Sequence, residues 1–139
     1  MSRKYRDGLE KVPANYQPLT PIHLLSRSAL VYPERIAIVH GDRRITYKDF
    51  YANARRLASA LTNCGVNPED TVSIMAANIP AFLDAHFGVP MTGAVLNSLN
   101  TRLDAKALAF ILDHAETDIL LTDTAYSKVI KEALSISSR

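Results

Sequence analysis

Hydrophobic and polar residues are arranged along this chain so that they predict alternating helices and strands from residue 20 onward. Residues 1–19 are polar and rich in turn formers, so we expect an extended lead-in. Thr20 followed by Pro21 is typical of a helix start, because threonine can accept from free backbone N–H groups and proline lacks only an N–H that would be unpaired there. Pro33 would end this helix. Its apolar face would consist of Ile22, Leu25 and Ala29.

A β-hairpin and a long amphipathic helix are predicted next. Two short apolar runs, 36–39 and 44–46, flank a turn that contains Gly41 and Asp42, a pattern typical of a hairpin. Thr46 and Asp49 then have the spacing of a capping box. The apolar residues that follow at helical spacing are Phe50, Ala54, Leu57, Ala58 and Leu61, before Gly65 at the expected helix end.

The remainder of the chain repeats the order strand then helix three times. Strands are predicted at 71–76, 93–96 and 118–121. Helices are expected to begin at Asn78 and Pro80, at Asp104, and at Asp123 or Thr124, and Pro90 should kink or end the first of them. Helical crossovers of this length imply neighbouring parallel strands. The predicted fold class is therefore α/β, a mostly parallel sheet covered by helices on both faces, with an early β-hairpin.

Composition excludes several classes of protein. The 139 residues are 47% hydrophobic and 22% charged, with a net charge of +2, which is typical of a globular chain. Basic residues such as Arg55 and Arg56 are scattered and are interpreted as a solvated face, so nucleic acid is not an expected partner.

No stretch approaches the ~20 apolar residues that span a bilayer. With one cysteine the chain fits a reducing compartment, and we expect a cytoplasmic protein unless a carboxyl-terminal organelle signal follows. The oligomeric state is not determined by the sequence.

Side chains that carry chemistry are sparse. No two of the five glycines lie within four residues of each other, so phosphate-binding loops of the G-x-G-x-x-G or P-loop type are absent, as is the G-x-S-x-G nucleophile elbow. The four histidines show no His-x-x-x-His pair, and Cys64 is expected to be a small buried residue near a helix end. Asp84, Asp113 and Glu116 fit a helix surface or a helix end. We therefore predict no catalytic residue and no metal ligand.

One polar loop is a candidate binding site. Residues 97–102 are predicted to leave the carboxyl end of the strand at 93–96, which is the edge where α/β sheets bind ligands. Asn100, Thr101 and Arg102 could donate hydrogen bonds to a phosphate or a carboxylate. The alternative is that Arg102 ties the loop to a neighbouring acidic residue.

Four stretches in the right order resemble the adenylate-forming (AMP-binding) superfamily. They are Pro33-Glu-Arg-Ile-Ala-Ile-Val, Arg44-Ile-Thr-Tyr-Lys-Asp-Phe, the run from Gly65 to Pro80, and Gly93-Ala-Val-Leu-Asn-Ser-Leu-Asn-Thr-Arg-Leu continuing through Ile111-Leu-Asp-His-Ala-Glu. Within that superfamily of acyl-CoA synthetases and related enzymes, the Leu-Asn-Thr-Arg-Leu loop and the Ala-His-Phe-Gly-Val-Pro helix look most like the fatty-acyl or aryl-acyl CoA ligase branch. The resemblance implies that 20–139 is an incomplete amino-terminal portion of the large adenylation domain, and that residues 1–19 precede it.

The resemblance also implies a reaction and its cofactors. A carboxylic acid and ATP would give an acyl-adenylate and pyrophosphate with the help of Mg²⁺, and coenzyme A would then displace AMP. In related acetate-activating enzymes, the loop that matches Asn100, Thr101 and Arg102 lies near coenzyme A, although glycines stand there in those enzymes. The phosphate loop, the adenine-binding element and the catalytic lysine of such enzymes have no counterpart in this chain, so none of the cofactors is expected to bind it well. Two alternatives remain: a non-catalytic binding module with the same fold, and an unrelated small α/β enzyme.

Overall fold

The computed structural model describes residue 8 and residues 10–138, so the rest of the lead-in, 1–7 and 9, lies outside the described residues. The helices are α1 (Pro21–Val31), α2 (Tyr47–Asn63), α3 (Pro80–Met91), α4 (Ala105–His114) and α5 (Ser127–Ile136), with a short 3₁₀ helix, η2 (Thr124–Tyr126), directly before α5. The strands are β1 (Ile36–His40), β2 (Arg43–Thr46), β3 (Thr71–Met75), β4 (Val95–Ser98) and β5 (Thr117–Thr122).

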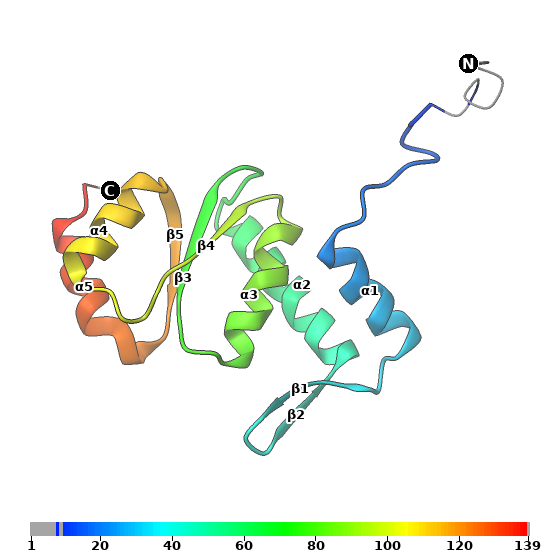
Figure 1. Ribbon diagram of the computed structural model, residues 1–139, viewed down its shortest axis with the longest axis horizontal. Coiled ribbons are helices and arrows are strands. Elements are labelled where there is room, and N and C mark those ends of the chain that lie inside the picture. Colours follow the sequence, from blue (N-terminus) through cyan, green and yellow to red (C-terminus); the bar gives the residue numbers. More distant parts are fainter. Residues whose placement is uncertain (1–7, 9, 139) are drawn as a thin grey trace, which may run out of the picture.

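A three-stranded parallel sheet lies at the centre of the molecule (Figure 1), in the order β4-β3-β5. Helices α2 and α3 lie on one side of this sheet, and α4 and α5 lie on the other. This arrangement confirms the predicted α/β class with helices on both faces. Each parallel strand needs a helical crossover to bring the chain back to the same edge, and α3 and α4 provide those crossovers.

Strand alternation divides the core between the two faces of the sheet. Val72 and Ile74 of β3 pack with α2 and α3 in one apolar cluster, whereas Met75 packs with α4 and α5 in a second. Val72 and Met75 have no exposed surface, which is expected for the central strand of a sheet covered on both faces. The sheet thereby fixes both helical layers relative to the carboxyl ends of its strands.

The predicted hairpin is confirmed as β1 and β2, which pair antiparallel around a turn with Gly41 at a positive φ of 56°. A third apolar cluster joins it to the helices. Ile45 of β2 packs there with Leu25 of α1 and Phe50 of α2. Phe50 also meets Phe87 of α3 edge to face, with ring centroids 5.1 Å apart. The hairpin and α1 therefore pack on the α2 and α3 layer and are separated from the parallel sheet.

Several helix caps are where the sequence places them. The Thr46 hydroxyl accepts from the Asp49 backbone N–H at 3.1 Å and donates to the Asp49 carboxylate at 2.8 Å. The Asp104 carboxylate accepts from the Ala107 N–H at 2.8 Å and caps α4. Pro90 lies in the last turn of α3, one residue before that helix ends.

The expected position of the fourth strand is wrong by two residues. The sequence predicts 93–96, and the structure has β4 at Val95–Ser98. Asn97 belongs to the sheet because its carboxamide donates to Ser73 Oγ on β3 at 2.9 Å, and that hydroxyl in turn lies 2.7 Å from Thr117 Oγ1 on β5. Ser73 is fully buried, so this chain of hydrogen bonds satisfies polar groups inside the protein. It overrides the weak strand preference of asparagine.

Two other expectations need correction. Cys64 is exposed, since it is the residue that caps the carboxyl end of α2 just before Gly65 turns the chain at φ 92°. The last helical segment is divided, because the Asp123 carboxylate accepts from the Ala125 N–H at 2.9 Å and so caps η2, and α5 begins only at Ser127.

Candidate functional site

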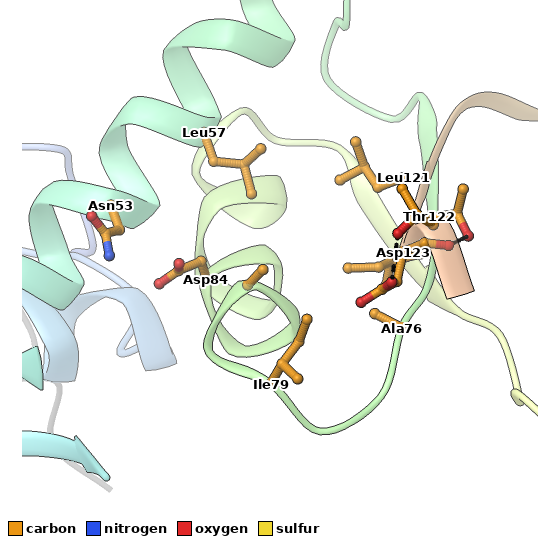
Figure 2. Close-up of a pocket in the computed structure, with 11 residues that line it drawn as sticks. Asn53, Leu57, Ala76, Ile79, Asp84, Leu121, Thr122 and Asp123 are labelled. Atoms are coloured by element: carbon orange, nitrogen blue, oxygen red, sulfur yellow. Dashed lines mark hydrogen bonds between the residues drawn. The ribbon is translucent and has the colours of Figure 1, made fainter. Parts of the chain in front are cut away.

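The carboxyl ends of three parallel strands meet at one edge of the sheet and place two distinct features there. Strands β3, β4 and β5 end at Met75, Ser98 and Thr122. The chain after β4 forms the loop that leads to α4. The chains after β3 and β5 border a cavity between the sheet and the α2 and α3 layer (Figure 2).

The loop after β4 holds the three residues that the sequence singles out. The Asn100 carboxamide oxygen accepts from the Arg102 backbone N–H at 2.9 Å, which shapes the turn. Buried Leu99 and the cap residue Asp104 hold its two ends. Asn100 and Arg102 are exposed and Thr101 is half-buried. Among the described residues Arg102 has no ion pair, so the expected alternative, a tie to an acidic neighbour, is not what the structure shows.

The cavity has a volume of about 530 Å³. Its wall is mainly apolar, with polar side chains contributed by α2, α3 and the end of β5. The lining residues are Asn53, Leu57, Ile74, Ala76, Ile79, Ala81, Asp84, Leu121, Thr122, Asp123 and Thr124. None of the three loop residues belongs to this lining, so the structure does not bring the predicted site residues and the cavity together.

Asp84 is the one carboxylate in this wall that lacks partners among the described residues. Its Oδ1 atom is closed to solvent and has no hydrogen-bond partner in the described part of the chain. Burial raises the pKa of the Asp84 carboxyl above its ordinary value of 3.8, although the positive charges of Arg56 and Arg43 act to lower it. A desolvated carboxylate without donors is costly unless a donor reaches it.

The other polar groups of the wall are already engaged. The Asp123 carboxylate accepts from the Ala125 N–H, and the Thr122 hydroxyl donates to the Met75 carbonyl oxygen at 3.2 Å. Asn53 accepts a short hydrogen bond from the Arg56 guanidinium. Figure 2 shows Asp84 on α3 beside Asn53 of α2, with Thr122 and Asp123 across the cavity.

Sequence reasoning missed the environment of Asp84. It assigned Asp84 to a helix surface, and this assignment is wrong for one of its carboxylate oxygens. The available signal was its helical spacing: Asp84 lies four residues before Gly88, on the same face of α3, and Gly88 is buried against α2. The assignment of Asp113 to a helix end is correct. It accepts from the Ser137 hydroxyl at 2.6 Å and from the Ser138 N–H at 3.1 Å.

The histidines and acidic residues do not assemble into a metal centre. Among the described residues, no group of three or more histidine, cysteine, aspartate or glutamate side chains lies in a position to hold a metal ion. His86 is exposed on α3, with its Nδ1 atom 2.8 Å from the Phe82 carbonyl oxygen. Within the same residues, no helix combines the length and the apolar character needed to cross a lipid bilayer.

Comparison with known proteins identifies the family of this fold. A family model described as AMP-binding enzyme matches residues 25–138, most of the chain. The chain belongs to the AMP-binding enzyme family. This match confirms the resemblance to the AMP-binding superfamily, and the CoA ligases among its relatives confirm the acyl-CoA synthetase branch.

Two plant members of this family are similar to this chain over nearly its whole length. Residue identity is 45% over 130 residues with a peroxisomal acetate/butyrate–CoA ligase of Arabidopsis thaliana and 47% over 130 residues with a peroxisomal butyrate–CoA ligase of the same plant. Each match covers 94% of this chain and 23% of the relative, so the chain spans less than a quarter of the length of these enzymes. A solved structure of o-succinylbenzoate–CoA synthetase from Bacillus subtilis in complex with AMP superimposes with a TM-score of 0.75 at 30% identity, covering 87% of this chain and 30% of that one.

Proposed function

We propose that this chain is the amino-terminal part of an ATP-dependent acyl-CoA ligase. The reaction would join a carboxylic acid to coenzyme A in two steps. The acid carboxylate attacks ATP to give an acyl-adenylate and pyrophosphate, and the thiol of coenzyme A then displaces AMP to give the thioester. The observation that carries this proposal is the 45% identity, over 130 residues, to an enzyme named for such a reaction.

The described residues do not fit ATP or Mg²⁺. Phosphate binding by backbone N–H groups needs closely spaced glycines or a free helix amino terminus shaped as a nest. Gly41 and Gly65 instead turn the chain at the hairpin and at the end of α2, and Gly88 lies between two packed helices. No metal-ligating cluster is present in this part of the chain. Under the proposal, the nucleotide and its metal are therefore held by other parts of the ligase, and we assign no step of the chemistry to residues 8–138.

The loop after β4 is the part of this chain that we place on the coenzyme A side. Arg102 is exposed, unpaired by any described acidic residue, and held in a turn at the carboxyl edge of the sheet. A guanidinium in that position suits the phosphates of coenzyme A, with Asn100 and Thr101 as additional donors.

The similarities support a short-chain acid as substrate and a peroxisomal location. Both plant relatives are named for acetate or butyrate, and both carry the word peroxisomal in their names. We therefore narrow the proposal from carboxylic acids in general to acids of two to four carbons, with aromatic acids as the competing class, because relatives of 43% and 42% identity are named for benzoate and trans-cinnamate. The peroxisomal location replaces the cytoplasmic one that composition alone favours, and a fluorescent fusion of the native protein would decide between them.

The experiment that tests this function has two steps. The mass of the native protein that contains this sequence is measured first, with an antibody raised against residues 10–138. Purified native protein is then given ATP, Mg²⁺ and coenzyme A with acetate, butyrate or a longer acid, and acyl-CoA is measured. A mass several times 15.3 kDa together with butyryl-CoA formation is expected. A native mass near 15.3 kDa, with no acyl-CoA formed, would overturn the proposal and leave the non-catalytic module with the same fold.

A further inference from the structure

The proposed ligase function does not use the cavity beside α3, yet this cavity contains an unsatisfied buried acceptor. Oδ1 of Asp84 is inaccessible to solvent and lacks a donor among the described residues. A carboxylate can rotate about its last side-chain torsion at little cost, so either oxygen can meet a donor that enters the cavity. A buried acceptor without a donor destabilises the fold, so we infer that a donor from another part of the protein enters the cavity.

The charges around the cavity determine which kind of partner it accepts. Asp84 and Asp123 both line the wall, so a carboxylic acid, an adenylate or a phosphate would be repelled by two carboxylates. The rest of the wall, including Leu57, Ile74 and Leu121, is apolar. A long side chain with an apolar stem and a cationic end satisfies both requirements. Lysine and arginine are the two side chains with that structure.

The two cations that act on Asp84 in the described part of the chain, Arg56 and Arg43, do not enter the cavity. The positive charge of Arg56 in α2 acts to lower the pKa of the Asp84 carboxyl, but the Arg56 guanidinium donates to Asn53. Arg43 of β2 contributes only a weaker long-range attraction. Neither residue belongs to the cavity lining. The cation that enters the cavity therefore has to come from outside the described residues.

We propose that the cavity receives a lysine or arginine side chain from a part of the ligase outside the described residues, which forms an ion pair with Asp84. This inference rests on the proposed function, because it needs the rest of the ligase. Relatives are more than four times as long as the matched segment, so more than three quarters of their polypeptide lies outside it. Strand β5 borders the cavity with Leu121 and Thr122. It pairs with β3 on one side and with no described strand on the other, so the remaining polypeptide can reach this open edge.

An ion pair here would join this segment to the remainder of the large domain. The cavity volume of about 530 Å³ exceeds the needs of one side chain, so apolar neighbours of the cation are expected to fill the space along Leu57 and Ile79. The buried pair makes removal of one partner costly, because the other charge is left without compensation. Asp84 thereby acts in positioning and stability, and it takes no part in the reaction.

The test uses the complete ligase and the substitution Asp84→Asn, which keeps the shape of the side chain and removes its charge. We expect the melting temperature at pH 7.5 to fall by about 3 °C or more. A cationic partner lowers the pKa of Asp84, so this loss should shrink as the pH falls through the folded-state pKa. Asp42→Asn, in the exposed hairpin turn, is the matched control and should leave the melting temperature unchanged.

Three outcomes would overturn the inference. An unchanged or raised melting temperature for Asp84→Asn would show that no cation meets the carboxylate. An Arg56→Gln variant that melts as low as Asp84→Asn, together with a double variant that melts no lower than either single variant, would assign the pair to Arg56 within this chain. Native mass spectrometry that finds a small amine bound to the wild-type ligase, and absent from the Asp84→Asn ligase, would replace the side chain by a ligand. Acyl-CoA formation by the wild-type ligase is measured in parallel, so failure of this inference is separable from failure of the proposed function.

Discussion

At the scale of single residues, Arg102 provides a direct test of the coenzyme A side. In the complete ligase, Arg102→Gln should raise the KM for coenzyme A by about tenfold, because one charge-assisted hydrogen bond to a phosphate is lost. The KM values for ATP and for the acid should stay unchanged. Lys106→Gln, a basic residue exposed at the start of α4, is the control. A rise in all three KM values would mean that Arg102 supports the fold and does not bind coenzyme A.

Asp84 leads to a second residue-scale prediction, which concerns the chain of 139 residues by itself. Burial raises the pKa of its carboxyl in the folded state, so folding favours the protonated form. That contribution is complete below the unfolded-state pKa, near 3.8, and is lost as the pH rises through the higher folded-state pKa. Urea unfolding of dilute protein should show Asp84→Asn gaining stability relative to wild type as the pH rises across this window. A constant difference between the two proteins would contradict the raised pKa.

Some residue roles were predictable because local chemistry determines them. Thr46 and Asp104 cap helices in the structure as the sequence predicts, since a cap depends only on residues within the next turn. Cys64 was assigned wrongly, and Asp84 wrongly for one of its carboxylate oxygens, because burial depends on how helices pack together. A cysteine that follows an apolar stripe can still point to solvent, and an aspartate on a helix can still be enclosed by a neighbouring helix.

At the scale of elements, the contact between α2 and α3 depends on Gly88. A Cβ atom at this position would lie 2.8 Å from the Ala54 carbonyl oxygen and 3.0 Å from the Leu57 side chain. Gly88→Ala should therefore destabilise the protein by about 1–3 kcal/mol, despite the better helix propensity of alanine. Urea unfolding measures the change. Ser59→Ala on the exposed side of α2 should stay within about 0.5 kcal/mol of wild type. Unchanged stability for Gly88→Ala would show that the two helices can separate without cost.

Element types were more predictable than element boundaries. The hairpin and the long helix follow from local turn signals and a stripe of helical spacing, and the structure confirms both. The start of β4 was not predictable, because Asn97 enters the sheet through a hydrogen bond to Ser73, which lies 24 residues earlier in the chain. Likewise, no local signal separates η2 from α5 beyond the cap at Asp123.

At the scale of the whole molecule, the order of elements was sufficient to predict the layers. Alternating strands and helices imply parallel strands with crossovers, and the structure has this topology in β3, β4 and β5 (Figure 1). The strand order β4-β3-β5, with β3 in the middle, follows from packing and was not part of the prediction. The cavity was also beyond prediction, because it is bounded by elements that are distant along the chain.

The strand order leads to a prediction about the chain of 139 residues by itself. Strands β4 and β5 are both edges of the three-stranded sheet, so each presents one row of backbone groups that no described strand pairs with. The face of α1 away from the core adds apolar surface, since Leu30 is 82% exposed and Leu24 56% exposed. Open strand edges and apolar surface both promote association between copies. We expect self-association of the isolated chain that increases with concentration in analytical ultracentrifugation, and no association through these strand edges when the sequence is part of the complete ligase domain. A chain that stays monomeric at every concentration would instead favour an autonomous binding module, because such a module has to be stable without neighbours.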